Sequence, residues 1–183
     1  MTELSLYAAI AVLIMAGVQD VWRLRITNFF PIAIVALYPA WVAAVGFDWS
    51  IWQNCAVFAV TLMIGILAFS RGLLGGGDVK LLAAIALWFD IQGSAALFAY
   101  VSIGGLLLSL ALIIGRRLVP STLLDRSGAL ALRPKGPIPY GVAIAGGAIL
   151  ALAAANMNPN PAQQAHKRLQ ELIILSKDGP HRH

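Results

Sequence analysis

The strongest constraint on this chain is a series of long apolar runs separated by short segments that carry arginine and lysine. A helix that crosses a bilayer needs about 20 apolar residues. Five runs approach this length: residues 4–22, 29–47, 51–70, 93–115 and 137–155. Only 11% of the 183 residues are charged, whereas soluble domains are about a quarter charged. The pattern predicts an all-α, polytopic membrane helix bundle.

A sixth run, residues 79–89, is short. Together with Asp78 it would extend about 18 Å as a helix, against a hydrocarbon core of about 30 Å. If it is counted as a span, about six transmembrane helices result, and Asp78 lies below the surface of the membrane at the start of the fourth helix. The expected membrane domain covers residues 1–155, and residues 156–183 form a polar C-terminal tail that is either a surface amphipathic helix or disordered.

The charges between the runs indicate an orientation. With the N-terminus outside, nine of the thirteen basic residues fall on or near the cytoplasmic side, as in the positive-inside rule. These are Arg23, Arg25, Arg71, Lys80, Arg116, Arg117, Arg126, Arg133 and Lys135. The remaining four lie in the tail, which this topology places outside. The first run lacks a basic leader segment and a small-residue cleavage site, so we interpret it as a retained span rather than a signal peptide.

Two carboxylates interrupt this apolar pattern at the expected cytoplasmic edge. Asp20 lies near the end of the first run, and Asp78 follows three consecutive glycines at the mouth of the fourth. Two carboxylates that meet in a low-dielectric site tend to share a proton. One can then act as general base on water while the other polarises a carbonyl group. The glycines would let backbone, or a substrate strand, approach the carboxylate closely.

Each acid also has a structural interpretation. Asp20 could be an interfacial residue that reaches water and pairs with Arg23, and Asp78 could be the N-cap of its helix. A phosphate loop is excluded, because Gly77 is followed by Asp rather than by Lys and a hydroxyl residue. A dinucleotide fingerprint is excluded too, since no strand precedes the glycines.

Other residues carry less information about chemistry. The scattered basic residues fit membrane topology and contact with anionic lipid better than nucleic-acid binding. Cys55 is the single cysteine, and the spacing of His166, His181 and His183 lacks a complete ligand set, so we predict no metal site.

In the last run, Gly141 with Ala145 and Ala143 with Gly147 stand four residues apart, which favours close helix packing. The five tryptophans lie mostly near the ends of the runs, as interface anchors do.

Three motifs in the right order resemble those of the type IV prepilin peptidases, which are membrane aspartic proteases of the GxGD type. "GGGDVKLLAAIALW" resembles the GxGD region of that family. "DVWRLRITN" resembles its first aspartate segment, in which Ile-Pro-Asn or a near variant follows the acid. "IPYGVAIAGG", residues 138–147, resembles the Pro-Tyr-Gly motif that opens the last span.

The resemblance implies a catalytic pair, Asp20 and Asp78, with Gly75 and Gly77 as the glycines of GxGD. Five further residues match accompanying motif positions without an assigned role: Asn28, Lys80, Pro139, Tyr140 and Gly141. Thr27 stands where the family often has proline. Because a proline would fix the turn after the first helix, the resemblance does not determine the geometry of this loop. Longer relatives carry a cysteine-containing insertion and also methylate their product. This chain has neither the insertion nor its paired cysteines and resembles the short form of Flp/Tad-type pilus systems, so we predict cleavage without methyltransferase activity.

The function that the resemblance implies is removal of a short basic leader from a prepilin, whose glycine precedes the cut and whose hydrophobic helix follows it. No cofactor or nucleic acid is expected, and the location implied is the bacterial inner membrane with the site near the cytoplasmic face. Two alternatives stay open from the residues alone: a small proton- or ion-translocating membrane protein, and a non-catalytic subunit of a secretion system. Cleavage that depends on both aspartates would separate these functions.

Overall fold

A computed structural model describes residues 2–47, 49, 51–118, 138–157 and 172. Within this part of the chain there are six α-helices and no strand: α1 (Thr2–Arg23), α2 (Phe29–Val45), α3 (Ile51–Ser70), α4 (Gly76–Ala86), α5 (Ile91–Leu118) and α7 (Tyr140–Met157). The predicted all-α class is confirmed. Contacts divide the chain into two units, Met1–Ala151 and Leu152–His183, and both aspartates and the pocket belong to the first.

Three helices are long and apolar enough to cross a membrane: Leu4–Arg23, Ile51–Ser70 and Ile91–Gly115. Two shorter helices, Phe29–Ala44 and Tyr140–Ala155, are apolar as well. Large apolar side chains are exposed along α3 and α5, among them Met63, Ile64, Leu106 and Leu107. A soluble monomer rarely exposes apolar surface on this scale, whereas lipid chains cover it without cost. The chain is therefore a polytopic membrane helix bundle.

The short helix α4 is the most enclosed element of the bundle. It packs against α3 and α2, and Val79, Leu81 and Ile85 are buried in these contacts. Close packing against α3 depends on Gly65, where a methyl group would come within 2.5 Å of Cγ1 of Val79. Because neighbouring helices cover α4, it does not need the length of a lipid-facing span.

The boundaries of α4 differ from the predicted run 79–89. The helix begins three residues earlier, since two of the three glycines enter it, and it ends at Ala86. The following turn is held from two sides: Asn54 Nδ2 donates a hydrogen bond to the Leu87 carbonyl (3.1 Å), and Trp88 Nε1 donates to the Ile34 carbonyl (3.3 Å). Trp88 is only 9% exposed and packs against Tyr38 and Trp41. The expected interface-anchor role is therefore wrong for Trp88.

Within the first unit, the beginning of α7 is in contact with both α1 and α5. A methyl group on Gly147 would come within 2.6 Å of the Val101 Cα atom of α5. On the other side, a methyl group on Gly17 of α1 would lie 3.3 Å from Cβ of Ala145. The small-residue spacing in the last run thus serves close helix packing, as predicted.

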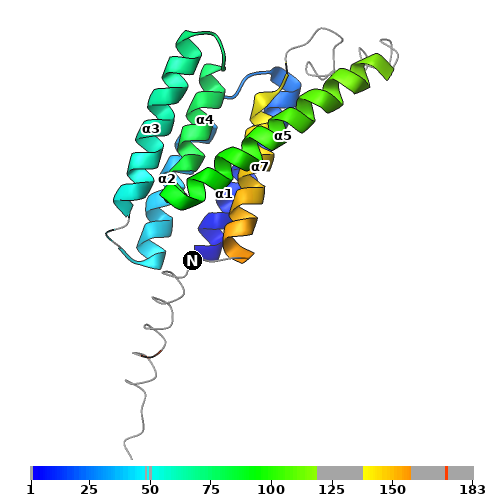
Figure 1. Cartoon of the computed structure of the whole chain (residues 1–183). Helices are drawn as coiled ribbons and strands as arrows, with labels where there is room; N and C mark the ends of the chain where they lie inside the picture. Colours follow the sequence, from blue (N-terminus) through cyan, green and yellow to red (C-terminus); the bar gives the residue numbers. More distant parts are fainter. Residues whose placement is uncertain (1, 48, 50, 119–137, 158–171, 173–183) are drawn as a thin grey trace, which may run out of the picture. The chain divides into compact units, whose positions relative to one another are not determined.

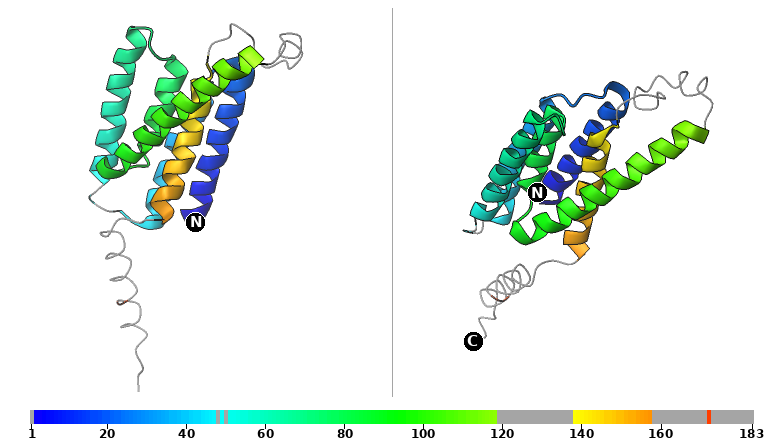
Figure 2. Two further views of the ribbon diagram at one scale, coloured as in Figure 1. Left: turned by 45° about the vertical axis from the view of Figure 1, so that its right-hand side comes forward. Right: turned by 45° about the horizontal axis from the view of Figure 1, so that its top comes forward.

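Successive helices of the bundle run in alternating directions (Figures 1 and 2). The last residues of α1, α3 and α5 therefore share one end of the first unit with the first residues of α2, α4 and α7. We call this the basic end, because Arg23, Arg25, Arg71, Lys80 and Arg117 all belong to it. The N-terminus and Asp90 belong to the opposite end. Arg126, Arg133, Lys135 and the C-terminal tail except residues 156, 157 and 172 lie outside the described residues. The domain boundary at residue 155 stays a prediction.

Candidate active site

Asp20 lies in the last turn of α1, and its carboxylate is buried inside the bundle rather than directed to water. The residue is 5% exposed. Its Oδ2 atom accepts a hydrogen bond of 2.7 Å from the backbone N–H of Gly141. Gly141 is in the first turn of α7, where backbone N–H groups have no partner within the helix and the helix dipole favours a negative group. The interpretation of Asp20 as an interfacial acid paired with Arg23 is therefore wrong.

Asp78 occupies the first turn of α4. The N-cap of this helix is Gly75, whose backbone is extended (φ −73°, ψ 144°). The N-cap interpretation of Asp78 is therefore wrong, because the N-cap lies three residues before it. Asp78 stands instead at the third helical position, where an acidic side chain is favoured by the dipole at the start of a helix. A methyl group on Gly75 would lie 2.7 Å from Asp78 Oδ2. The glycine thus leaves this carboxylate room.

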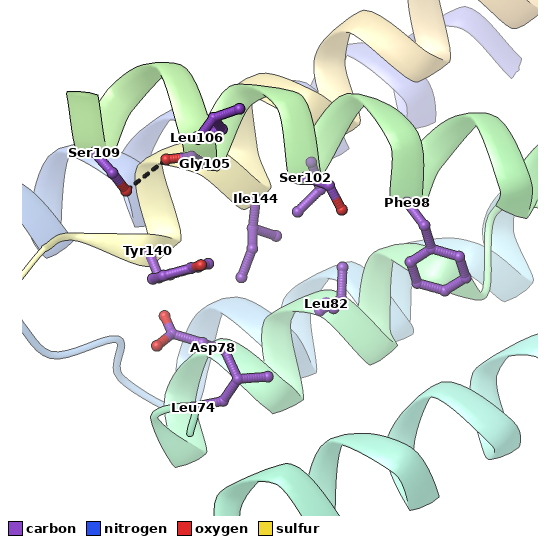
Figure 3. A pocket seen from close by; sticks show the side chains of 11 residues that line it. Leu74, Asp78, Leu82, Phe98, Ser102, Gly105, Leu106, Ser109, Tyr140 and Ile144 are labelled. Atoms are coloured by element: carbon purple, nitrogen blue, oxygen red, sulfur yellow. Dashed lines mark hydrogen bonds between the residues drawn. The ribbon is translucent and has the colours of Figure 1, made fainter. Parts of the chain in front are cut away.

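A pocket of about 380 Å³ opens beside Asp78, between α4, α5 and the start of α7. Figure 3 shows the Asp78 carboxylate directed toward the ring of Tyr140, with Leu82 and Phe98 further along the pocket. Ser102, Gly105 and Ser109 line it from α5. The Ser109 hydroxyl donates to the Gly105 carbonyl (2.6 Å) and is therefore satisfied within its own helix. The lining is mainly apolar, and its polar side chains are those of Asp78, Tyr140, Ser102 and Ser109.

The two carboxylates belong to one site. They come from different helices, α1 and α4, and lie at the same end of the bundle. The first turn of α7 contacts both, since Gly141 binds Asp20 and Tyr140 stands in the pocket wall beside Asp78. Two carboxylates that come together in surroundings of low dielectric constant can hold one proton between them and so present an acid and a base together.

The remaining residues singled out from the sequence surround this pair. Lys80 Nζ donates a hydrogen bond of 2.9 Å to Asn28 Oδ1, and both side chains are exposed. Pro139 is buried immediately before α7. Gly77 faces the loop between α1 and α2: a methyl group there would lie 3.0 Å from Cβ of Ile26.

Sequence reasoning missed two residues in this region, Gln19 near the end of α1 and Ile26 in the loop that follows it. The Gln19 Oε1 atom accepts hydrogen bonds from the backbone N–H (3.4 Å) and the hydroxyl (3.3 Å) of Thr27. A proline at position 27 would restrict the loop through its ring but could not donate the backbone hydrogen bond. In this chain, the two hydrogen bonds from Thr27 hold the loop instead. Gln19 precedes the first aspartate directly, and this adjacency was the only signal that the sequence offered.

In the described part of the chain, no group of three or more His, Cys, Asp or Glu side chains could hold a metal ion. The three histidines considered from the sequence all lie outside the described residues.

Fold and site together define a class: a polytopic membrane protein with two carboxylates at one end of its bundle, one of them beside a mainly apolar pocket. Comparison with family models gives a match to the type IV leader peptidase family over residues 7–110. The chain belongs to this family and is a peptidase at the level of that family. The matched residues include Asp20, Asn28, Gly75, Gly77, Asp78 and Lys80, whereas residues 139–141 follow the matched range. Searches of the curated proteins and of the solved structures find no match.

Proposed function

We propose that this protein is a membrane aspartic endopeptidase that removes the leader peptide from prepilin-like precursors, with Asp20 and Asp78 as its catalytic pair. The observation that supports the proposal is the placement of both acids at one end of the bundle, where the first turn of α7 contacts Asp20 through Gly141 and shares a pocket with Asp78 through Tyr140. Membership in a leader peptidase family supports the reaction class. The motif order Asp, GxGD and Pro-Tyr-Gly supports the choice of precursor.

In the proposed reaction, the ionised member of the pair takes a proton from a water molecule as the water oxygen attacks the scissile carbonyl carbon. The protonated member donates a hydrogen bond to the carbonyl oxygen, where negative charge develops. The tetrahedral intermediate then collapses, the C–N bond breaks, and the leaving amine takes up a proton from the pair. Water, peptide and the two acids are sufficient for this sequence, and a general acid–base pair contributes about 10²–10⁴-fold per proton transfer.

The pocket fits the precursor that the motifs indicate. Its lining by Leu82, Phe98 and Ile144 suits the apolar segment that follows a prepilin cleavage site. The peptide bond itself must be extended at Asp78, because a helical carbonyl is occupied by its own hydrogen bond. The position of both acids at the end of the bundle rather than at its middle gives water access to this bond.

The orientation of the protein follows from its charges. The basic end holds Arg23, Arg25, Arg71, Lys80 and Arg117 as well as both acids, and cytoplasmic segments of membrane proteins are enriched in such residues. We therefore propose the bacterial inner membrane as the location, with the candidate site at the cytoplasmic face. Anionic lipid is the expected partner of the exposed basic side chains.

We further propose that the protein cleaves without methylating the new N-terminus. The sequence lacks the cysteine-containing insertion of the longer, bifunctional relatives, since Cys55 is its only cysteine.

The test is incubation of the purified protein in liposomes with a prepilin precursor and S-adenosylmethionine, followed by intact-mass measurement of the product. We expect loss of the leader, a single new N-terminus and no added methyl group, and we expect no product from Asp20→Asn. Leader removal at the wild-type rate by folded Asp20→Asn would contradict the catalytic pair, and a methylated product would contradict the second proposal. Ion flux without cleavage would favour the translocating alternative.

A further inference from the structure

The loop between α1 and α2 places one apolar side chain between the two segments that carry the acids. Ile26 is half-buried. A methyl group on Gly77, the neighbour of Asp78, would lie 3.0 Å from Ile26 Cβ and 3.1 Å from its carbonyl oxygen. A methyl group on Gly141, which binds Asp20, would come within 2.7 Å of Ile26 Cδ1. Ile26 is thus in tight contact with both glycines.

The two contacts involve different parts of the same residue. The backbone and Cβ of Ile26 face Gly77 at the start of α4, and its terminal methyl group reaches Gly141 at the start of α7. Glycine at both positions lets the loop approach both helices closely. Any change in the length of this side chain therefore changes the space between the first turns of α4 and α7.

The loop is held firmly enough to act as a spacer. At its start, Leu24 has a φ of +51°, which is unusual for a bulky residue and turns the chain sharply away from α1. In its middle, Thr27 donates two hydrogen bonds to Gln19 of α1. At its end, Asn28 accepts a hydrogen bond from Lys80 of α4. Ile26 lies between these attachments and cannot shift without breaking one of them.

We propose that Ile26 is a positioning residue, which sets the separation of the Asp20 and Asp78 carboxylates by filling the space between Gly77 and Gly141. The inference rests on the proposed function for its catalytic consequence, but its structural consequence stands independently. Displacement of a catalytic group by about 1 Å can cost 10²-fold in rate. Truncation of Ile26 therefore lowers the rate of the chemical step far more than it weakens precursor binding in the pocket.

The kinetic test compares Ile26→Ala and Ile26→Val with a matched control, Ile10→Ala. Ile10 is also half-buried and also belongs to the N-terminal part of the chain, but it lies far from the basic end along α1. We expect Ile26→Ala to lower kcat for leader removal about 10²-fold with KM within about twofold. Ile26→Val loses only the methyl group that reaches Gly141, so its kcat falls less, by about tenfold. Ile10→Ala stays within about twofold of the wild type.

A second measurement does not depend on activity. Spin labels at Arg23→Cys and Leu73→Cys, in a Cys55→Ser background, report the separation between the end of α1 and the segment that leads into α4. We expect Ile26→Ala to broaden or shift this distance distribution, while Ile10→Ala leaves it unchanged. An unchanged distribution in Ile26→Ala, or a kcat equal to that of Ile10→Ala, would overturn the positioning role. Absence of cleavage by the wild type would instead contradict the proposed function and leave the distance measurement to decide this inference.

Discussion

Gly75 and Gly76 are adjacent and chemically identical, yet a side chain would meet different surroundings at the two positions. At Gly75 a methyl group would lie 2.7 Å from Asp78 Oδ2, whereas at Gly76 its nearest neighbour would be the Phe69 ring at 3.4 Å. The pattern GxGD has its variable position at Gly76. The structure thus leaves room for a side chain at Gly76, whereas one at Gly75 would crowd the Asp78 carboxylate.

This difference leads to a prediction at the residue scale. Gly75→Ala forces the Asp78 carboxylate to move, so we expect the rate of leader removal to fall about 10²-fold. Gly76→Ala, the matched control, stays within about twofold of the wild type and leaves the thermal unfolding temperature unchanged or slightly raised, because alanine suits a helix better than glycine. Equal rates for the two variants would contradict the assigned crowding at Asp78.

The two acids of the site could be predicted from the sequence, but Gln19 and Ile26 could not. Asp20 and Asp78 stand out because acids are rare in membrane helices. Ile26 carries no such signal, since isoleucine is abundant throughout an apolar chain. Trp88 shows the same limit: its position near the end of a run indicated the membrane interface, whereas its indole N–H is paired with the Ile34 carbonyl inside the bundle.

At the scale of elements, apolar run length predicted the helices well where lipid surrounds them. The run at 51–70 coincides with α3, and the run at 93–115 falls within α5. The predicted run at 79–89 misses the boundaries of α4. Glycine disfavours a helix, yet Gly76 and Gly77 belong to this one. Enclosure by α2 and α3 outweighs that intrinsic preference. A local sequence pattern contains no information about such tertiary packing.

The contact between α5 and α7 allows a matched test at this scale. A methyl group on Gly147 would come within 2.6 Å of the Val101 backbone, whereas a methyl group on its neighbour Gly146 would meet nothing within 4 Å. We expect Gly147→Ala to lower the free energy of unfolding by about 1–3 kcal/mol, the usual cost of overpacking. Gly146→Ala should raise it by up to about 1 kcal/mol. Thermal unfolding in one detergent measures both, and a destabilised Gly146→Ala variant would contradict this account of the interface.

At the scale of the whole molecule, alternation of helix direction brings distant segments of the sequence together. The first and fourth helices deliver their aspartates to the same end, and the last described helix adds Gly141 (Figure 1). The count of spans and the charge pattern predicted that both acids share one membrane edge. Whether their side chains meet depended on packing between α1, α4 and α7, which no local sequence signal specifies.

The proposed orientation makes a prediction for the intact protein. Leu73 lies at the basic end and Phe47 at the opposite end, and both are exposed. In a Cys55→Ser background, we expect Phe47→Cys to react with a membrane-impermeant maleimide in intact cells whose outer membrane has been made permeable. Leu73→Cys should react only after the inner membrane is disrupted. The reverse pattern would place the candidate site on the other face of the membrane.

The central claim is that the carboxylate of Asp78 performs chemistry, and the chain contains a matched control for it. Asp90 lies at the opposite end of the bundle, where its Oδ1 atom accepts a hydrogen bond of 2.6 Å from the Gly93 N–H at the start of α5. Asparagine caps a helix about as well as aspartate, so Asp90→Asn retains this structural role.

The most direct measurement is therefore the rate of leader removal by Asp78→Asn and Asp90→Asn, followed by mass spectrometry in liposomes that contain equal amounts of folded protein. The account predicts loss of at least about 10²-fold for Asp78→Asn, since a general acid–base group is removed, and a rate within about twofold of the wild type for Asp90→Asn. Cleavage by Asp78→Asn at the rate of Asp90→Asn would contradict it.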